Sequence, residues 1–237
     1  MSAIHRCPKC DATFSPPREL QSQCPKCGIW FHKWNAPLPT AAVMTVDAME
    51  EAEEQVPPPD SLTYYGRAGA LVFVAVWGVF LAAVDYTGPP TSFSFMHSIL
   101  LPIHEAGHVF FRLFGEFMTI AGGSLFQLLL PFGIGVAFYV KQRDPFGAAM
   151  CLWWTGASLI DLSPYIYDAL DPQLILLGGH TGEDGPHDWI YLLDKFGSLR
   201  RAHTWGTFAH HLGVMVMIGA VAWGARWLWK QAPWRRA

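Results

Sequence analysis

Charged residues are scarce in this sequence. Asp, Glu, Lys and Arg make up 15% of the 237 residues, whereas soluble domains carry about 25%. Most of the acidic residues fall before Ser61 or after Ile160, so the middle of the chain is nearly free of charge. Hydrophobic residues make up 51%, which favours a membrane protein over a soluble one. The net charge of −3 gives no indication of nucleic acid as a partner.

The N terminus lacks the apolar core of an export signal. The first ten residues, MSAIHRCPKC, contain no run of hydrophobic side chains, so we expect no cleaved signal peptide. In a segment that is not exported, closely spaced cysteines indicate metal binding rather than disulfides. We therefore expect a multi-pass protein of the cytoplasmic (inner) membrane, with its N terminus in the cytosol.

Four of the five cysteines form two Cys-x-x-Cys pairs, Cys7 with Cys10 and Cys24 with Cys27. Each pair makes a tight turn that points two thiolates at one ion, and two such turns supply the sulfur ligands of a closed tetrahedral zinc site. A redox pair or unpaired thiols are the alternative. So few apolar residues surround the pairs that zinc must supply most of the stability.

Residues 1–35 are therefore predicted to form a zinc ribbon, with one β-hairpin between the two cysteine pairs. We expect it to offer a surface to a cytosolic protein partner. Residues 36–62 read as a linker that is rich in acidic residues and ends on three consecutive prolines, Pro57 to Pro59.

Residues 63–237 are predicted to form a domain embedded in the lipid bilayer. A membrane-spanning helix needs about 20 apolar residues, and five stretches are mostly apolar: 68–84, 93–114, 117–140, 146–168 and 203–225. The predicted fold is therefore mainly α, a polytopic membrane helix bundle with four to five spans and a small N-terminal β-hairpin. One of the central stretches could instead be re-entrant.

A second possible metal site is His104-Glu105-Ala106-Gly107-His108, which matches the pattern H-E-x-x-H. Residues four apart share one face of a helix, so both imidazoles can bind one Zn²⁺. Glu105 lies beside the metal, where a carboxylate can act as general base on a bound water. Ionisable residues are costly inside a membrane, and three of them within five residues need a shared partner. Helix–helix hydrogen bonds, or a segment that faces water, are the alternative.

A zinc site with one open position needs a third protein ligand. Asp161 and Asp168 are the leading candidates, because both lie in a mostly apolar helix and are seven residues apart on one face. His187 and Asp188 are weaker candidates, because a flexible polar loop positions ligands poorly. The residues alone leave the choice open.

Other polar residues in the apolar stretches have less specific interpretations. Gln127 is the only strongly polar side chain in its stretch. It is a candidate for donating a hydrogen bond to a substrate carbonyl or to the oxyanion, and an interhelical hydrogen bond is the alternative. We expect His210 and His211 to be packing or interfacial residues.

Residues 93–169 resemble the site-2 protease group of intramembrane zinc metallopeptidases. The resemblance rests on the HEAGH motif in a membrane helix, on Gly122-Gly123 in the next helix, and on a later helix that carries Pro and Asp. Asp161-x-x-Pro164 stands where this group has Asn-x-x-Pro. Asp168 stands one residue before the usual ligand position and is followed by Ala169 instead of Gly.

This resemblance implies a peptidase that cleaves membrane-spanning or membrane-proximal segments of a membrane protein or peptide. It implies that zinc is held by His104, His108 and Asp168, with Asp161 as the alternative ligand and Glu105 as general base. With the ribbon, we expect two zinc ions in the chain. The competing hypothesis is a membrane adaptor without proteolytic activity, in which the HEAGH site is structural and the ribbon binds a cytosolic partner.

Overall fold

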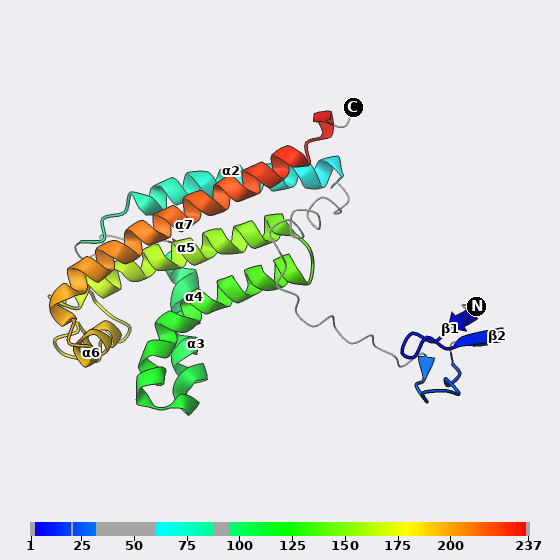
Figure 1. The fold of residues 1–237 in the computed structure, drawn as a ribbon. Coiled ribbons are helices and arrows are strands. Elements are labelled where there is room, and N and C mark those ends of the chain that lie inside the picture. Colours follow the sequence, from blue (N-terminus) through cyan, green and yellow to red (C-terminus); the bar gives the residue numbers. More distant parts are fainter. Residues whose placement is uncertain (1–2, 20, 32–59, 88–94, 236–237) are drawn as a thin grey trace. The chain divides into compact units, whose positions relative to one another are not determined.

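A computed structural model describes residues 3–19, 21–31, 60–87 and 95–235. The chain divides into two compact units, Met1–Glu54 and Gln55–Ala237, which are drawn in Figure 1. The predicted linker, residues 36–62, lies outside the described residues except for its last three. Of these, Asp60 caps the first helix of the second unit, because its side chain accepts a hydrogen bond from the N–H group of Thr63.

The N-terminal unit is built on a two-stranded antiparallel hairpin. Strand β1 (Ala3–Arg6) pairs with β2 (Thr13–Glu19). The hairpin therefore encloses the first cysteine pair, whereas we predicted a hairpin between the two pairs. The second pair lies in a turn that ends at Gly28, whose φ of +73° is a conformation that glycine adopts with little strain. The rings of Phe14 and Phe31 pack edge to face beside the cysteines.

The C-terminal unit is a bundle of helices (Figure 1), so the prediction of a mainly α protein is confirmed. Its α-helices are α2 (Ser61–Ala82), α3 (Phe95–Phe111), α4 (Glu116–Val140), α5 (Pro145–Asp168), α6 (Asp188–Lys195) and α7 (Ala202–Lys230). In the described part of this unit, three short 3₁₀-helices accompany them: η2 (Arg112–Phe114), η3 (Leu199–Arg201) and η4 (Pro233–Arg235).

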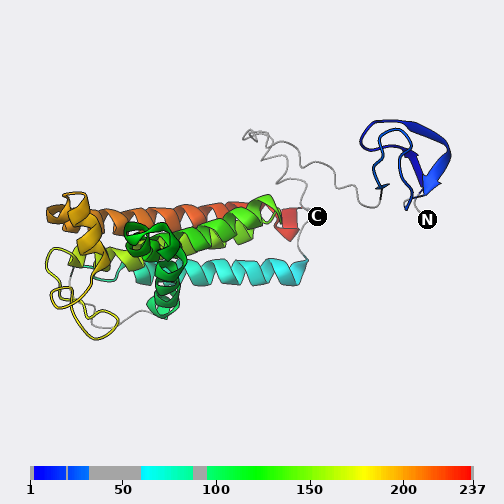
Figure 2. The ribbon, with the colours of Figure 1, turned by 90° about the horizontal axis from the view of Figure 1, so that it is seen from below.

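Among the residues that the structure describes, three helical segments are long and apolar enough to cross a membrane, namely Ser61–Ala82, Glu116–Val140 and Leu199–Lys230. This indicates a membrane protein, but it does not confirm the predicted four to five spans. Helix α3 has only 17 residues and crosses the bundle instead of running along it (Figures 1 and 2). Helix α5 runs beside α7 (Figure 1), also contacts α2 and has 24 residues. Its polar residues, which include Asp161 and Asp168, lower its hydropathy.

Small residues bring α5 and α7 close together. A Cβ atom added to Gly213 would lie 2.7 Å from the carbonyl oxygen of Gly156, and one added to Gly156 would lie 2.8 Å from that of Gly213. Such contacts let helix backbones approach closely, as is common between membrane helices. Trp153 and Met217 pack in the core beside this contact.

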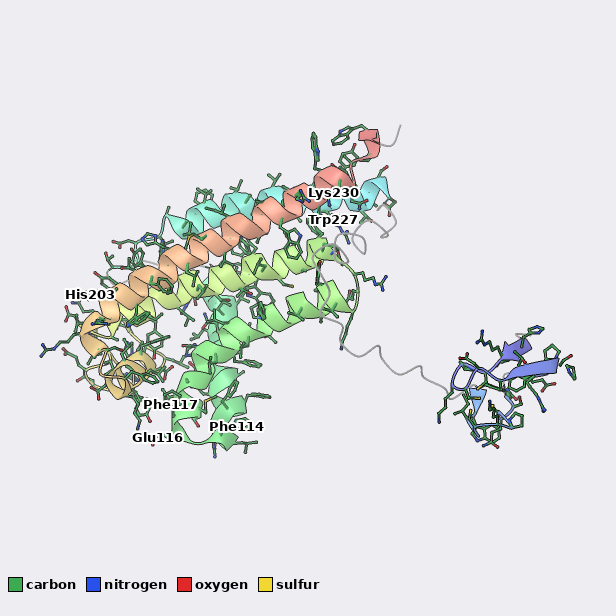
Figure 3. The ribbon with its side chains drawn as sticks, viewed as in Figure 1. Phe114, Glu116, Phe117, His203, Trp227 and Lys230 are labelled. Atoms are coloured by element: carbon green, nitrogen blue, oxygen red, sulfur yellow. The ribbon has the colours of Figure 1, made fainter. Side chains whose placement is uncertain are left out.

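The two ends of the bundle differ in charge. At one end, Arg67 near the start of α2 forms an ion pair of 3.1 Å with Asp144 before α5, and its guanidinium lies 5.0 Å from the ring centre of Trp227 near the end of α7. Figure 3 shows Trp227 and Lys230 at this end and His203 at the other. The cations at the first end are Arg67, Lys141, Arg143, Arg226 and Lys230. At the opposite end, residues 168–201 carry the acids Asp168, Asp171, Glu183, Asp184, Asp188 and Asp194 and the cations Lys195, Arg200 and Arg201.

Candidate metal centre

The cysteines of the N-terminal unit converge as predicted from their spacing. The Sγ atoms of Cys7 and Cys27 are 3.6 Å apart, and those of Cys10 and Cys24 are 3.8 Å apart. All four Sγ atoms lie within 4.8 Å of one another, so they could hold one metal ion. No cysteine in the described residues forms a disulfide. We name Cys7, Cys10, Cys24 and Cys27 the cysteine cluster.

The turn at the second pair favours a thiolate at Cys24, whereas burial and the neighbouring thiols raise the pKa of Cys27 to about 12. Burial raises the pKa of the Cys24 thiol, but hydrogen bonds from the backbone N–H groups of Cys27 and Lys26 lower it to about 6. A thiolate is the form in which cysteine binds metal.

In the bundle, glycines bring α3 and α4 into close contact beside the HEAGH motif. A Cβ atom on Gly107 would overlap the carbonyl oxygen of Gly122, and one on Gly122 would lie 2.7 Å from the carbonyl oxygen of Gly107. The contact holds His104 and His108, on the inner face of α3, against the first turns of α4.

Both histidines meet one carboxylate oxygen. The Nε2 atoms of His104 and His108 lie 3.0 and 3.2 Å from Oδ2 of Asp188. One ligand atom from each of the three residues lies within 4.8 Å of the others, so this group could also hold a metal ion. We name His104, His108 and Asp188 the His-His-Asp group.

The other nitrogen of each ring is engaged by an acceptor. Nδ1 of His108 lies 2.8 Å from the carbonyl oxygen of Thr119, so this nitrogen carries a hydrogen. Nδ1 of His104 lies 2.9 Å from Oε1 of Gln127, whose Nε2 donates to Oδ2 of Asp161 at 3.0 Å. A carboxylate only accepts hydrogen bonds. The amide group must therefore turn its oxygen to His104, and the Nδ1 atom of His104 must carry a hydrogen as well.

This assignment leaves a cluster of electron pairs. In neutral imidazoles with hydrogen on Nδ1, both Nε2 lone pairs point at the Asp188 carboxylate, and three electron-pair donors repel one another unless a cation lies among them. Gly123 lets both rings approach the backbone of α4, because a Cβ atom there would lie 2.5 Å from Nε2 of His104 and 2.6 Å from Nε2 of His108. The set of donor atoms thus fits a metal ion.

Asp188 is acidic for a carboxyl group in a buried position. Burial raises its pKa, but the side chains of His104 and His108 lower it to about 2. The carboxylate is therefore already in the form that a metal ion requires.

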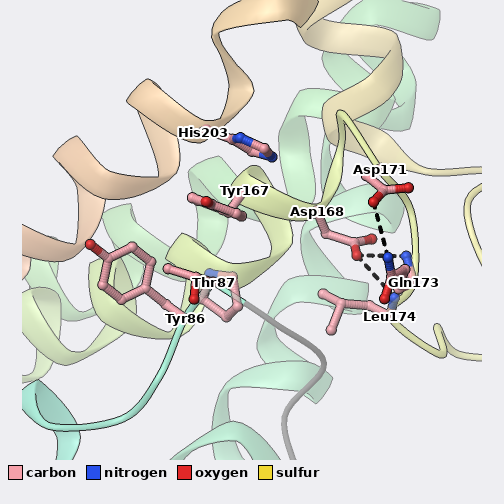
Figure 4. A pocket seen from close by; sticks show the side chains of 9 residues that line it. Tyr86, Thr87, Tyr167, Asp168, Asp171, Gln173, Leu174 and His203 are labelled. Atoms are coloured by element: carbon pink, nitrogen blue, oxygen red, sulfur yellow. Dashed lines mark hydrogen bonds between the residues drawn. The ribbon is translucent and has the colours of Figure 1, made fainter.

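The aspartates that we ranked highest lie elsewhere. Oδ1 of Asp168 accepts hydrogen bonds from the backbone N–H groups of Gln173 and Leu174 at 2.7 and 3.0 Å (Figure 4), and its Oδ2 lies 3.3 Å from Nε2 of His187. Asp161 contacts Gln127 and His97. Neither residue belongs to the groups of possible metal ligands in the described part of the chain. The structure brings Asp188 to the histidines instead.

Asp188 is held more firmly than a loop residue would be. It is the first residue of α6, and His187 caps this helix by accepting the N–H group of Ile190 on Nδ1 at 3.3 Å. Nε2 of His187 can therefore donate to the buried Asp168. The backbone N–H group of Asp188 donates to the hydroxyl of Tyr165 at 2.9 Å. The signal that could have identified Asp188 is an acidic residue at the start of an amphipathic helix.

Glu105 and Gln127 lie beside the His-His-Asp group, whereas His210 does not. Glu105 is half-buried next to His104 and makes no hydrogen bond or ion pair to any residue that the structure describes. Gln127 uses its oxygen on His104 and its nitrogen on Asp161, so it lies behind the His-His-Asp group. His210 packs away from it, stacked on Tyr86 and 3.2 Å from the carbonyl oxygen of Ala82.

The chain was also compared with known proteins. No protein family, no curated protein and no solved structure matches it.

Proposed function

We propose that this chain is a membrane-embedded zinc peptidase of the site-2 protease type, which hydrolyses membrane-spanning or membrane-proximal peptide bonds. The observation that carries the proposal is the Glu105 carboxylate, which makes no hydrogen bond or ion pair to a described residue and directly follows one histidine of a three-ligand group. Two histidines and one carboxylate leave a fourth position open, which is typical of catalytic zinc sites, whereas structural sites fill all four positions.

The distances support zinc at both places. Around a tetrahedral zinc ion, sulfur ligands at about 2.3 Å are about 3.8 Å apart, and nitrogen or oxygen ligands at about 2.0 to 2.1 Å are about 3.3 Å apart. The cysteine cluster has Sγ separations of 3.6 and 3.8 Å. The His-His-Asp group has Nε2–Oδ2 separations of 3.0 and 3.2 Å.

Each residue has a role in this proposal. His104, His108 and Asp188 would hold the ion. Zinc held there would make a bound water molecule more acidic and would polarise the scissile carbonyl. Glu105 takes a proton from the attacking water and returns it to the nitrogen of the leaving amine. The cysteine cluster has no open position, so the N-terminal unit takes no part in the chemistry and binds a cytosolic partner.

We further propose that α2, α4, α5 and α7 all cross the bilayer. At about 1.5 Å per residue, the 24 residues of α5 extend about 36 Å, and its polar side chains face neighbouring helices. The number of crossings is then even. The cation-rich end, where α2 begins and α7 ends, faces the cytosol under the positive-inside rule. The His-His-Asp group lies toward the opposite face of the membrane, because Asp188 follows the far end of α5.

Cysteine labelling tests this orientation. Gln142, in the turn between α4 and α5, and Glu183, in the connection between α5 and α6, are both exposed. In intact cells, a membrane-impermeant maleimide is expected to label Glu183→Cys and to leave Gln142→Cys unlabelled until the cells are opened. The reverse pattern would invert the orientation, and labelling of both residues from outside would exclude the even number of crossings.

The competing function is a membrane adaptor, which the separate compact N-terminal unit favours. An adaptor needs no general base, so Glu105 distinguishes the two functions. We expect Glu105→Gln to retain zinc in the bundle and to lower cleavage of a membrane substrate in proteoliposomes by a factor of about 10² to 10⁴. Glu116→Gln is the matched control, because Glu116 is an exposed residue at the start of α4. Unchanged cleavage by Glu105→Gln would exclude the peptidase mechanism, and no cleavage by the parent protein would favour the adaptor.

A further inference from the structure

A chain of hydrogen bonds runs behind the His-His-Asp group. It passes from Nδ1 of His104 to Oε1 of Gln127 at 2.9 Å, from Nε2 of Gln127 to Oδ2 of Asp161 at 3.0 Å, and from Oδ1 of Asp161 to Nδ1 of His97 at 3.0 Å. The side chains come from α3, α4 and α5, and His97 returns the chain to α3 two turns before His104. These hydrogen bonds therefore form a network that begins and ends on α3 and joins three helices.

Gln127 is the most constrained member. It is 2% exposed, and both ends of its amide are engaged. Burying an amide in a membrane helix is costly unless its hydrogen bonds are made. Its two partners also have fixed polarity in this arrangement, because Asp161 only accepts and the Nδ1 atom of His104 must then donate. The direction of the amide therefore determines which nitrogen of His104 has a lone pair for the metal ion.

We propose that Gln127 and Asp161 are positioning residues, which fix the tautomer and ring orientation of His104 so that its Nε2 lone pair faces the metal position. Asp161 acts through Gln127 by orienting the amide, and His97 holds the second oxygen of Asp161. This inference rests on the proposed metal site but not on peptidase activity. Loss of an outer partner of a metal-bound histidine weakens metal binding by roughly 10- to 100-fold.

Exchanging the amide and the carboxylate between positions 127 and 161 tests the proposal. In Gln127→Glu, a carboxylate faces the Asp161 carboxylate across one hydrogen-bond distance, and we expect the bundle to bind metal about 10- to 100-fold more weakly. In the double variant Gln127→Glu/Asp161→Asn, the new amide at position 161 can donate to the new carboxylate at position 127, and its oxygen can accept from His97. We expect this second change to restore most of the lost affinity. A merely structural role for Gln127 predicts no such rescue.

Cobalt binding to the purified full-length protein gives a readout that needs no cleavage. Thiolate-to-cobalt absorption reports the cysteine cluster and serves as an internal reference, while the weaker visible bands of a nitrogen and oxygen site report the bundle. Competition with a chelator then gives the affinity of each site separately. Ser124→Ala is the matched control, because the buried hydroxyl of Ser124 has no hydrogen-bond partner among the described residues. We expect its affinity to equal that of the parent.

Gln127→Met keeps a similar shape and adds no charge, so it serves if Gln127→Glu fails to fold. We expect it to weaken metal binding to the bundle while leaving the thiolate signal unchanged. Parent-like affinity in Gln127→Met, or a folded double variant no better than Gln127→Glu, would overturn the proposal. A parent protein that binds cobalt without cleaving substrate would refute the peptidase alone. A bundle that binds no metal would refute the metal site and this inference together.

Discussion

The cysteine cluster and the His-His-Asp group bring metal ligands together in opposite ways. The cysteines lie within 21 positions of the chain, with Cys7 and Cys27 separated by 20 in sequence, and two local turns aim them. His104 and Asp188 are 84 positions apart, and several packed helices bring them together. We therefore expect the first unit to depend on a metal ion for its structure, whereas the second has a core of its own on which the His-His-Asp group is built.

Removing metal should have the largest effect, and only on the N-terminal unit. Its described buried core contains just Cys7, Cys24 and Phe31, so it cannot stay folded when four unliganded thiols replace the ion. The bundle has clusters such as the one around Leu100 and Trp153 and should keep its helices. After chelation, we expect amide hydrogen exchange to lose all protection in residues 3–31 and to change little in α5 and α7.

Cysteine substitutions test whether loss of the metal unfolds the N-terminal unit alone. Cys24→Ser with Cys27→Ser should reproduce the unfolding of the N-terminal unit while the bundle keeps its metal. Cys151→Ser is the control, because Cys151 is buried in α5 outside both groups. Helices that melt on chelation would show that the bundle, too, depends on its ion.

The contrast between the two sites also explains what the sequence could predict. Ligands that lie on one turn or one helix have a characteristic spacing in the sequence, so they can be predicted from it. This applies to Cys-x-x-Cys turns and to histidines four apart on a helix. Asp188 could not be identified in this way, because its position depends on a connection that leaves α5 at Asp168 and returns at His187. Those two residues hold the start of α6, but the sequence shows the connection only as a polar stretch.

The same difference between local and long-range information applies to the fold. Apolar length predicted α2, α4 and α7, which are long and apolar enough to cross a membrane. It could not show that α3 crosses the bundle, because orientation depends on which helix the Gly107 face meets. The polarity of Gln127 was conspicuous in the sequence, but its partners were not, since they come from two other helices.

Gly123→Ala tests whether the close approach of both histidine rings to α4 is needed for metal binding. The added Cβ atom would lie 2.5 Å from one Nε2 atom and 2.6 Å from the other, so the rings would have to move. We expect the bundle to lose measurable metal, a loss greater than the roughly 100-fold that removing an outer partner causes. Gly133→Ala is the control on the same helix, because a Cβ atom there would meet no described atom within 4 Å. Normal metal content in Gly123→Ala would place the ion elsewhere.

Asp188→Asn should have the next largest effect. It removes the charge from the third ligand but leaves its hydrogen bond from the backbone to Tyr165 in place, so α6 should stay where it is. A neutral amide is a poor zinc ligand, and we expect metal affinity to fall by about 100-fold, at the upper end of the losses caused by outer partners. Competition with a chelator measures this loss. An affinity within a few fold of the parent would exclude Asp188 as a ligand.

Asp168→Asn should have the smallest effect on metal affinity. If Asp168 were the zinc ligand, as predicted from the sequence, its effect would be among the largest. An asparagine oxygen can still accept the N–H groups of Gln173 and Leu174, but its amide nitrogen then faces Nε2 of His187. His187 must move its hydrogen to Nδ1 to accept this bond, and it can then no longer accept the N–H group of Ile190. Losing a helix cap costs about 1 kcal/mol, which corresponds to a loss of metal affinity of about fivefold if the cost falls wholly on the metal-bound form. A loss larger than that of Asp188→Asn, in the same chelator competition, would instead make Asp168 the ligand.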